Sequence, residues 1–323
     1  MTDHYLLSQE TQLQHDYPAL ICPLMQKLQY GEFMGVDKVN IVYAFLLHPC
    51  PIGSVVISSG RIECLLKYQE LIYDLYQNGY CVFIHDHRGQ GFSGRMTDNS
   101  HMGYVQDFTD YVTDFKIFYD TVIKLKSEYQ PQLLCHSMGG AIGALYVHAY
   151  PQDFGHVVFS APMFGIRPPM PAWLVTGLLR LNELINTFSG KPTAYFFGQG
   201  NYENIHFADS QLTHSEVRYR LFREEYERQP RVQLGGVTCQ WLKAARAAMD
   251  KIESLAGTLS IPALVLQAGA DQVVDNKRQD LVVASMPHCK KVVIKGAKHE
   301  LLMEEDKYRM PCLVAALDFF KQP

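Results

Sequence analysis

Short runs rich in valine and isoleucine alternate with helical patterns along most of this chain. Strand-like runs occur at residues 39–47, 55–58, 81–85, 133–136, 157–160, 263–267 and 291–295. Between most of them, apolar residues recur every three or four positions, at residues 65–76, 108–129, 138–148, 277–285 and 308–320. This alternation is typical of a mostly parallel sheet covered by helices on both faces. The sequence therefore predicts an α/β fold.

The alternation stops at residues 163–236, where no Val/Ile run of strand length occurs. After three prolines, an apolar helical pattern follows at residues 173–185 and a charged amphipathic one at 217–222. A chain of 323 residues is long enough for one domain with a sizeable insertion. We therefore expect a core formed by residues 1–162 and 237–323, an N-terminal extension with some helix up to about residue 36, and a helical cap at 163–236.

A serine stands where the strand-like run at residues 133–136 turns into a helical pattern. A serine at such a corner is typical of the nucleophile elbow, G-x-S-x-G. Ser137 and Gly139 match this pattern, whereas Cys135 occupies the place of the first glycine. That position must be small because the helix packs closely on the strand, so we expect Cys135 to face inward and to be inert.

A serine hydroxyl becomes a nucleophile only with a base beside it and a third group that orients the base. In the α/β-hydrolase order, the acid and then the histidine follow the serine, each after a late strand. Asp271 follows the run at 263–267, and His299 follows the run at 291–295. The sequence therefore predicts the triad Ser137, Asp271 and His299. Asp275 remains an alternative acid, or a cap for the next helix.

The tetrahedral intermediate of acyl transfer needs backbone N–H donors for its oxyanion. We expect one from Met138, directly after the nucleophile, and one from Arg61, in the loop after the run at 55–58. The reaction would pass through an acyl ester of Ser137 that water then cleaves. No metal and no cofactor is expected for this chemistry.

The amino-acid composition limits which kinds of binding partner and which cellular compartment we expect for this protein. A net charge of -4 with no basic stripe argues against a nucleic-acid partner. Eight scattered cysteines without a C-x-x-C pair indicate neither a disulfide framework nor a metal site, which favours a reducing, cytoplasmic location. The first residues lack a secretion signal. Acids and bases nearly balance at residues 216–231, so Arg218 and Arg220 are expected on a solvated helix face.

Six motifs in this order resemble a known family. They are GRIE at residues 60–63, DHRGQGFSG at 86–94, HSMGG at 136–140, APMFG at 161–165, LQA and VVDN at 266–268 and 273–276, and KGAKHE at 295–300. On these residues the chain resembles the monoacylglycerol lipase branch of the α/β-hydrolases, and within it the bacterial lysophospholipases. Ser59 departs from the His-Gly that related lipases carry at the oxyanion loop.

The resemblance implies a carboxylic ester hydrolase that cleaves the acyl ester of lysophospholipids or related monoacyl glycerolipids, with the cap forming an acyl tunnel. Trp173, Leu174 and Leu178 are candidates to line that tunnel and to touch the inner membrane, although they would serve equally as ordinary core residues. The triad alone permits a broad carboxylesterase or thioesterase. A catalytically silent lipid-binding protein is the alternative from another class.

Overall fold

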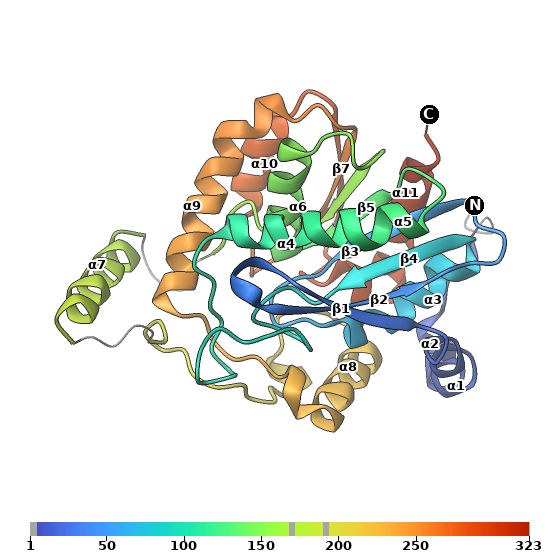
Figure 1. Cartoon of the computed structure of the whole chain (residues 1–323). Helices are drawn as coiled ribbons and strands as arrows, with labels where there is room; N and C mark the ends of the chain where they lie inside the picture. The colour runs from blue at the N-terminus through green and yellow to red at the C-terminus, as the bar shows by residue number, and fades with distance from the viewer. Residues whose placement is uncertain (1–4, 168–171, 190–193, 323) are drawn as a thin grey trace.

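One eight-stranded sheet runs through the computed structural model, which describes residues 5–167, 172–189 and 194–322 (Figure 1). The strand order is β1-β2-β4-β3-β5-β6-β7-β8. The first two pairings are antiparallel and the others are parallel, so the predicted α/β fold is confirmed. The strands are β1 (Gln29–Met34), β2 (Asn40–Leu46), β3 (Gly53–Ser58), β4 (Tyr80–His85), β5 (Gln132–His136), β6 (Val157–Ser160), β7 (Ala263–Ala268) and β8 (Cys289–Ile294).

Helices cover both faces of the sheet. Residues of α4, α6, α9 and α10 join one buried apolar cluster, and residues of α1, α2, α3 and α11 join the other. The helices are α1 (Glu10–Asp16), α2 (Cys22–Met25), α3 (Gln69–Gln77), α4 (Phe108–Phe118), α5 (Lys124–Lys126), α6 (Met138–Ala149), α7 (Ala172–Ser189), α8 (Glu216–Arg228), α9 (Cys239–Leu255), α10 (Asn276–Ser285) and α11 (Asp306–Phe320).

The central strands contribute to both clusters because successive side chains point to opposite faces. In β5, Leu133 and Cys135 belong to the cluster under α4 and α6, whereas Leu134 belongs to the cluster under α3 and α11. All three are at most 1% exposed. Burial on both faces explains why these strands are apolar throughout rather than alternating.

The N-terminal extension contains a strand that the sequence pattern did not predict. Helices α1 and α2 lie in the extension as expected, but β1 follows them and pairs with β2 from Gln29 opposite Phe45 to Met34 opposite Asn40. As an edge strand it is only partly buried, so its residues need not form a Val/Ile run. The long helix expected at 108–129 is likewise divided, because a π-helical turn at Tyr119–Ile123 separates α4 from α5.

Within residues 163–236, the described part forms α7, α8 and irregular chain, without a strand. Helix α7 lies at one end of the molecule, set apart from the sheet (Figure 1). It contacts α9 through an apolar cluster that contains Val175, Cys239 and Leu242. Arg246 of α9 also donates a hydrogen bond to the Thr176 hydroxyl at 3.1 Å.

The expected solvent-exposed position of Arg218 is wrong. Its side chain is fully buried, where it pairs with Glu70 of α3 at 2.9 Å and Asp306 of α11 at 2.8 Å. These ion pairs connect α8 to α3 and α11. The balance of charges within residues 216–231 could not predict them, because both acids are far away in the sequence. Arg220, two positions later, is exposed as expected.

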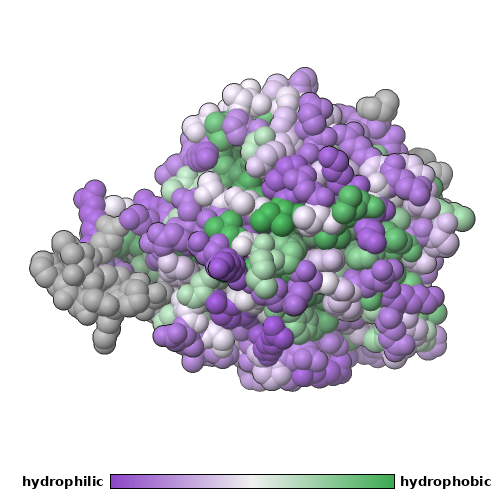
Figure 2. All heavy atoms as spheres, in the orientation of Figure 1, coloured by the Kyte–Doolittle hydropathy of each residue, from purple (hydrophilic) through white to green (hydrophobic). Residues whose placement is uncertain are grey.

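None of the helices in the described ranges is both long enough and apolar enough to span a membrane. On the face drawn in Figure 2, hydrophilic residues predominate and hydrophobic ones form small patches between them. This face therefore presents a mixed surface rather than one continuous apolar area.

Candidate active site

Ser137 occupies a strained turn between β5 and α6. Its φ of 50° and ψ of -117° lie outside the regions that non-glycine residues prefer. The turn is held by its own backbone, because the Ser137 N–H donates to Ser160 and its carbonyl accepts from Met163, at 3.1 and 2.9 Å. Such a turn projects the serine side chain from the carboxyl end of the strand.

Close backbone contact explains the glycine two residues later. A Cβ atom on Gly139 would lie 2.1 Å from the carbonyl oxygen of Ser58, at the end of β3. Any side chain there would force the two segments apart. The start of α6 is therefore pressed against the loop that leads from β3 to Arg61.

The three residues of the predicted triad form a chain of hydrogen bonds. His299 Nδ1 lies 2.8 Å from Asp271 Oδ2, and His299 Nε2 lies 2.9 Å from Ser137 Oγ. All three side chains are buried. Burial alone would raise the pKa of Asp271, but the hydrogen bond and charge of His299 and two backbone N–H groups lower it. The carboxylate is therefore ionised and accepts the Nδ1 proton, which leaves Nε2 to accept from the serine hydroxyl.

Asp275, the alternative acid, has a different position. It is the N-cap of α10, and its carboxylate accepts a hydrogen bond from the Lys277 N–H at 3.0 Å. The other carboxylate oxygen of Asp271 accepts from the N–H groups of Val273 and Val274, at 2.8 and 3.0 Å. The geometry thus favours Asp271 as the partner of His299 and leaves Asp275 the capping role.

The two predicted oxyanion donors lie in the segments that Gly139 brings together. Among the described residues, neither the Arg61 N–H nor the Met138 N–H donates a hydrogen bond. The Met138 N–H is free because the first turn of a helix has no internal acceptors. Gln90 braces the other segment, since its side chain donates to the carbonyls of Gly60 and Glu63 at 2.8 and 3.0 Å.

A cavity of about 590 Å³ opens above Ser137 and His299. This volume falls within the range of roughly 300–1,000 Å³ that is typical of small-molecule sites. Most of its lining comes from residues 163–236, including Val175 of α7 and Phe222 of α8, and Trp241 of α9 adds to it. The surroundings of the serine are therefore largely apolar.

The three candidate tunnel residues on α7 do not all fall in the described part of the structure. The side chain of Trp173 lies outside it. Leu174 and Leu178 are partly buried but do not line the cavity, which α7 reaches through Val175 instead. Leu178 packs beside the apolar cluster that contains Val175 and Leu242. Their contact with substrate remains a prediction.

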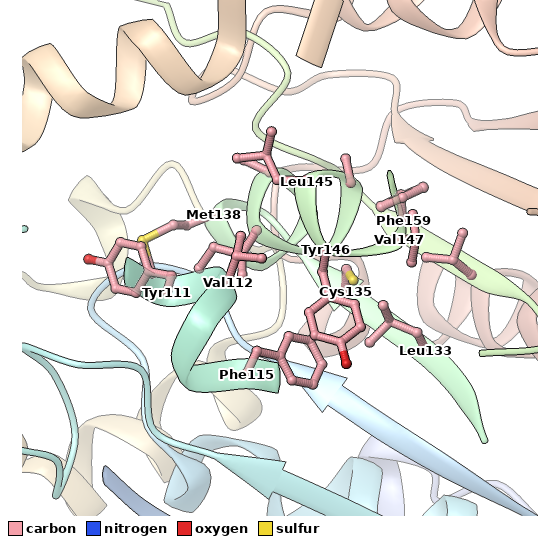
Figure 3. Close-up of a cluster of buried hydrophobic side chains, with 14 of the residues drawn as sticks. Tyr111, Val112, Phe115, Leu133, Cys135, Met138, Leu145, Tyr146, Val147 and Phe159 are labelled. Atoms are coloured by element: carbon pink, nitrogen blue, oxygen red, sulfur yellow. The ribbon is translucent and has the colours of Figure 1, made fainter. Parts of the chain in front are cut away.

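Cys135, which stands where the elbow pattern has its first glycine, is fully buried in the contact between strand and helix. Figure 3 shows its sulfur between β5 and α6, close to Leu133 and Tyr146. A Cβ atom on Gly143 of α6 would lie 2.4 Å from this sulfur, so the glycine on the helix side of the contact leaves room for the cysteine on the strand side. Burial raises the pKa of the thiol well above its ordinary value, so the side chain stays protonated.

Four buried ionisable groups lie directly beside the triad, and we call Glu63, Lys67, His136 and Glu300 the ion cluster. Lys67 Nζ lies 2.5 Å from Glu63 and 2.7 Å from Glu300. His136 Nε2 lies 3.2 Å from Glu300. His136 precedes Ser137 and Glu300 follows His299, so the cluster connects the two segments that carry these residues.

The charges in the ion cluster are mutually dependent. Burial would raise the pKa of Glu300, but Lys67 and His136 hold it well below its ordinary value. Burial would lower the pKa of Lys67 and of His136, but Glu300 and Glu63 raise both. Glu63, His136 and Glu300 also bring potential metal-ligand atoms within 4.8 Å of one another. The Lys67 ammonium already lies between the two carboxylates and supplies the positive charge there.

Part of the ion cluster lies in recognisable sequence motifs, but the spacing of apolar residues does not show that these motifs meet in space. GRIE and KGAKHE, recognised as motifs, contain Glu63 and Glu300, but their roles follow only from the spatial proximity of the two loops. Lys67 lies outside every motif.

Comparison with known proteins identifies the family of this chain. Residues 49–306 match the hydrolase family described as serine aminopeptidase, S33. Lysophospholipase L2 of Escherichia coli is 37% identical over 299 residues, which cover 90% of this chain and 87% of that protein. Monoglyceride lipase of Rattus norvegicus is 26% identical, with 86% of this chain and 87% of that protein covered. The resemblance to the monoacylglycerol lipase branch and to bacterial lysophospholipases is confirmed.

Solved structures show the same fold. Monoacylglycerol lipase of Paleococcus ferrophilus superposes with a TM-score of 0.66 at 19% identity, covering 87% of this chain and 98% of that one. A soluble variant of monoglyceride lipase from Saccharomyces cerevisiae superposes with a TM-score of 0.67 at 18% identity, covering 91% and 95%. These likenesses confirm the predicted α/β-hydrolase fold.

The contact between Cys135 and Gly143 generates a prediction about stability. Gly143→Ala should lower the free energy of unfolding by about 1–3 kcal/mol, because the new methyl group overlaps the Cys135 sulfur. In a Cys135→Gly background the same substitution should stabilise the protein, since alanine is the better helix former by about 1 kcal/mol. Urea denaturation of the four proteins in a double-mutant cycle measures the coupling. Equal effects of Gly143→Ala in both backgrounds would contradict the contact.

The ion cluster predicts a pH-dependent loss of stability. Glu300→Gln removes the partner of two buried cations and should cost about 3–5 kcal/mol at pH 6. A raised pKa means that His136 stabilises the fold below its unfolded value of about 6.5, and this contribution is lost as pH rises through the folded pKa. The loss of stability caused by Glu300→Gln should therefore become smaller as pH rises above about 6.5, but it should not vanish, because Lys67 stays charged.

Urea denaturation across this pH range provides the measurement, with Glu203→Gln at an exposed position as the matched control. The control should change stability by less than about 0.5 kcal/mol at every pH. A penalty for Glu300→Gln that grows with pH would be inconsistent with the assigned charges.

Proposed function

This chain belongs to the serine aminopeptidase S33 family of hydrolases, and from that premise we propose that it cleaves the acyl ester of lysophospholipids or related monoacyl glycerolipids. The observation that carries the proposal is the hydrogen-bond chain from Ser137 through His299 to Asp271 at the base of a largely apolar cavity. The names of the relatives support ester hydrolysis and a lipid substrate.

In the proposed reaction His299 Nε2 takes the Ser137 proton as the hydroxyl oxygen attacks the ester carbonyl. Asp271 keeps the imidazole oriented and balances its charge. The imidazolium then protonates the leaving glycerol oxygen, and the acyl group stays on Ser137. His299 next takes a proton from water as the water oxygen attacks the acyl ester, and it returns this proton to the Ser137 oxygen as the fatty acid leaves. The chemistry uses only protein groups and water.

The N–H groups of Arg61 and Met138 act in this proposal as the oxyanion hole. Both lack an acceptor within the described chain, and both belong to segments that meet at Gly139. Donors held in place by the fold need no reorganisation when the charge develops, and one such donor contributes about 10²–10³ in kcat. Ser59, in place of the histidine of related lipases, leaves these backbone donors available.

We assign residues 163–236 to a cap over the core formed by residues 1–162 and 237–323. The lining of the cavity supports this division, because most of it comes from the cap segment while Ser137 and His299 come from the core. An apolar cap excludes water and accommodates a single acyl chain, with Trp173, Leu174 and Leu178 as further candidates for lipid contact. The α7 region is the part proposed to touch the membrane surface.

For the compartment we propose the cytoplasm, with peripheral contact at the inner membrane where the lipid substrate resides. The state of the cysteines supports a reducing environment, since all eight are unpaired. Neither a cofactor nor a nucleic-acid partner is part of the proposal.

Covalent labelling and substrate comparison test the function. A fluorophosphonate should label wild-type protein at Ser137, whereas Ser137→Ala should remain unlabelled. Rates on an oleoyl lysophospholipid and on monooleoylglycerol should exceed those on short aryl esters when a lipid interface is present. Absence of an adduct in folded wild type would instead support a silent lipid-binding protein, and equal or faster cleavage of short soluble esters would support a broad esterase.

The acid can be assigned with two matched substitutions. Asp271→Asn keeps the shape of the side chain but removes the charge that orients His299, so kcat should fall by about 10⁴-fold. Asp275→Asn should change kcat less than about threefold, because asparagine is an equally good N-cap. Steady-state kinetics on one ester substrate measure both effects. A larger loss for Asp275→Asn would transfer the role to that residue.

A further inference from the structure

The cavity above Ser137 contains charged groups that the hydrolytic mechanism does not use. Lys67, Glu63 and Glu300 line it but neutralise one another within the ion cluster. Arg167 and Asp209 also line it, at exposed positions. The remaining charged side chains in the lining are two arginines, described next.

Arg61 is a partly buried cation without a carboxylate partner among the described residues. Its Nη2 donates to the carbonyl of Gly235 at 2.5 Å, and its guanidinium lies 5.2 Å from the ring centre of Trp241. Its Nε is completely buried and donates no hydrogen bond to the described chain. Burial lowers the pKa of Arg61 to about 10, which reflects the missing counter-charge.

Arg223, on helix α8, also lacks an acid partner among the described residues, although burial, which would lower its pKa, is outweighed by Tyr202 and Tyr219, which raise it. Its Nη1 donates to the Tyr202 hydroxyl at 3.2 Å, and its guanidinium lies 5.0 and 5.2 Å from the ring centres of Tyr219 and Phe222. Its Nε is also buried and unpartnered within the described residues, which include no acid paired with it. Aromatic faces attract the cation but do not replace a hydrogen-bond acceptor.

The two arginines contact two neighbouring segments of chain, one at Gly235 and the other at Tyr202. Arg61 bonds the carbonyl of Gly235, a Cβ atom on Gly235 would lie 2.7 Å from the Tyr202 N, and Arg223 bonds the Tyr202 hydroxyl. Both side chains line the same cavity as Ser137. Two guanidinium groups without an acid partner among the described residues therefore line the space that the substrate enters.

We propose that Arg61 and Arg223 form a subsite for the phosphate of a phospholipid head group. This inference rests on the proposed function and adds to it the feature that distinguishes lysophospholipids from neutral monoacylglycerols. A buried cation without a counter-charge is costly, and an incoming phosphate supplies the missing negative charge. A guanidinium matches phosphate with its planar fork of N–H donors, which the lysine ammonium lacks.

The occupant is assigned as a phosphodiester rather than a fatty carboxylate. The carboxyl end of the acyl chain must lie at Ser137, where the ester is cleaved, so the anion at the arginines belongs to the other end of the substrate. The largely apolar rest of the cavity accommodates the acyl chain. In this proposal the two arginines bind the polar head group, and the apolar lining of the cavity binds the acyl chain.

Binding and kinetics with two lipids of identical acyl chain test this subsite. The probes are 1-oleoyl-lysophosphatidylethanolamine and monooleoylglycerol in mixed detergent micelles. In Arg223→Gln, the ratio of kcat/KM for the phospholipid to kcat/KM for the glycerolipid should fall at least about tenfold, chiefly through KM. Arg220→Gln is the matched control on the same helix, because its side chain is exposed, and it should keep the wild-type ratio.

The same two lipids are titrated onto Ser137→Ala protein with and without Arg223→Gln, so that the subsite is measured without turnover. Wild-type preference for the phospholipid that disappears with Arg223→Gln supports the proposal even if hydrolysis of lipids is not observed. Inorganic phosphate is added as a competitor to distinguish a site for free phosphate. Displacement by inorganic phosphate alone, with no preference between the lipids, would overturn the assignment to a head group.

Two further variants keep the test decisive if Arg223→Gln folds poorly. Arg61→Lys and Arg223→Lys retain the positive charge but lose the planar fork, and each should lower the preference for the phospholipid by a smaller factor. Thermal unfolding verifies that the variants are folded. An equal loss on both lipids would indicate a structural role for the arginines and would refute the subsite.

Discussion

The close contact between the backbones at Gly139 and Ser58 is the constraint on which the site depends. It presses the start of α6 against the loop after β3, and it coexists with an unfavourable backbone conformation at Ser137. A sharp turn of this kind costs free energy, which the surrounding sheet and helices must supply. In return the turn places Ser137 at the carboxyl end of β5, while the segments carrying the N–H groups of Arg61 and Met138 meet. The same packing contact therefore positions both the proposed nucleophile and the proposed oxyanion donors.

A second constraint is the concentration of charge under an apolar cavity. His136 and Glu300 are direct sequence neighbours of Ser137 and His299, so the ion cluster links the loops that must stay aligned for proton transfer. Buried ion pairs contribute little net stability, but losing one partner is costly. This asymmetry favours one arrangement of the two loops over its alternatives. A change that separates the loops of the proposed triad would therefore also break the buried ion pairs and destabilise the core.

The cavity combines surfaces that suit an amphiphile. Its largely apolar lining is interrupted by Arg61 and Arg223, whose Nε donors find no acceptor in the described chain, and by Ser137 and His299 at the base. The arginines come from the loop after β3 and from helix α8. A ligand that bridges these parts would hold them together, because anything that binds the assembled cavity stabilises it. In the proposed subsite, binding of the head group would therefore also stabilise the position of the proposed cap.

Local sequence determined the parts of this protein that depend on near neighbours in the chain. The buried strands, the elbow at Ser137, and the acid and histidine after late strands all follow from periodicity and spacing, and the triad residues lie within hydrogen-bond distance as that pattern requires. Tertiary structure decided what depends on distant partners. It buried Arg218 against α3 and α11, added β1 at the edge of the sheet, matched Cys135 with Gly143, and placed Arg61 and Arg223 where no described acid pairs with them. Whether a charge is solvated, paired or free is set by contacts across the fold, which no local pattern specifies.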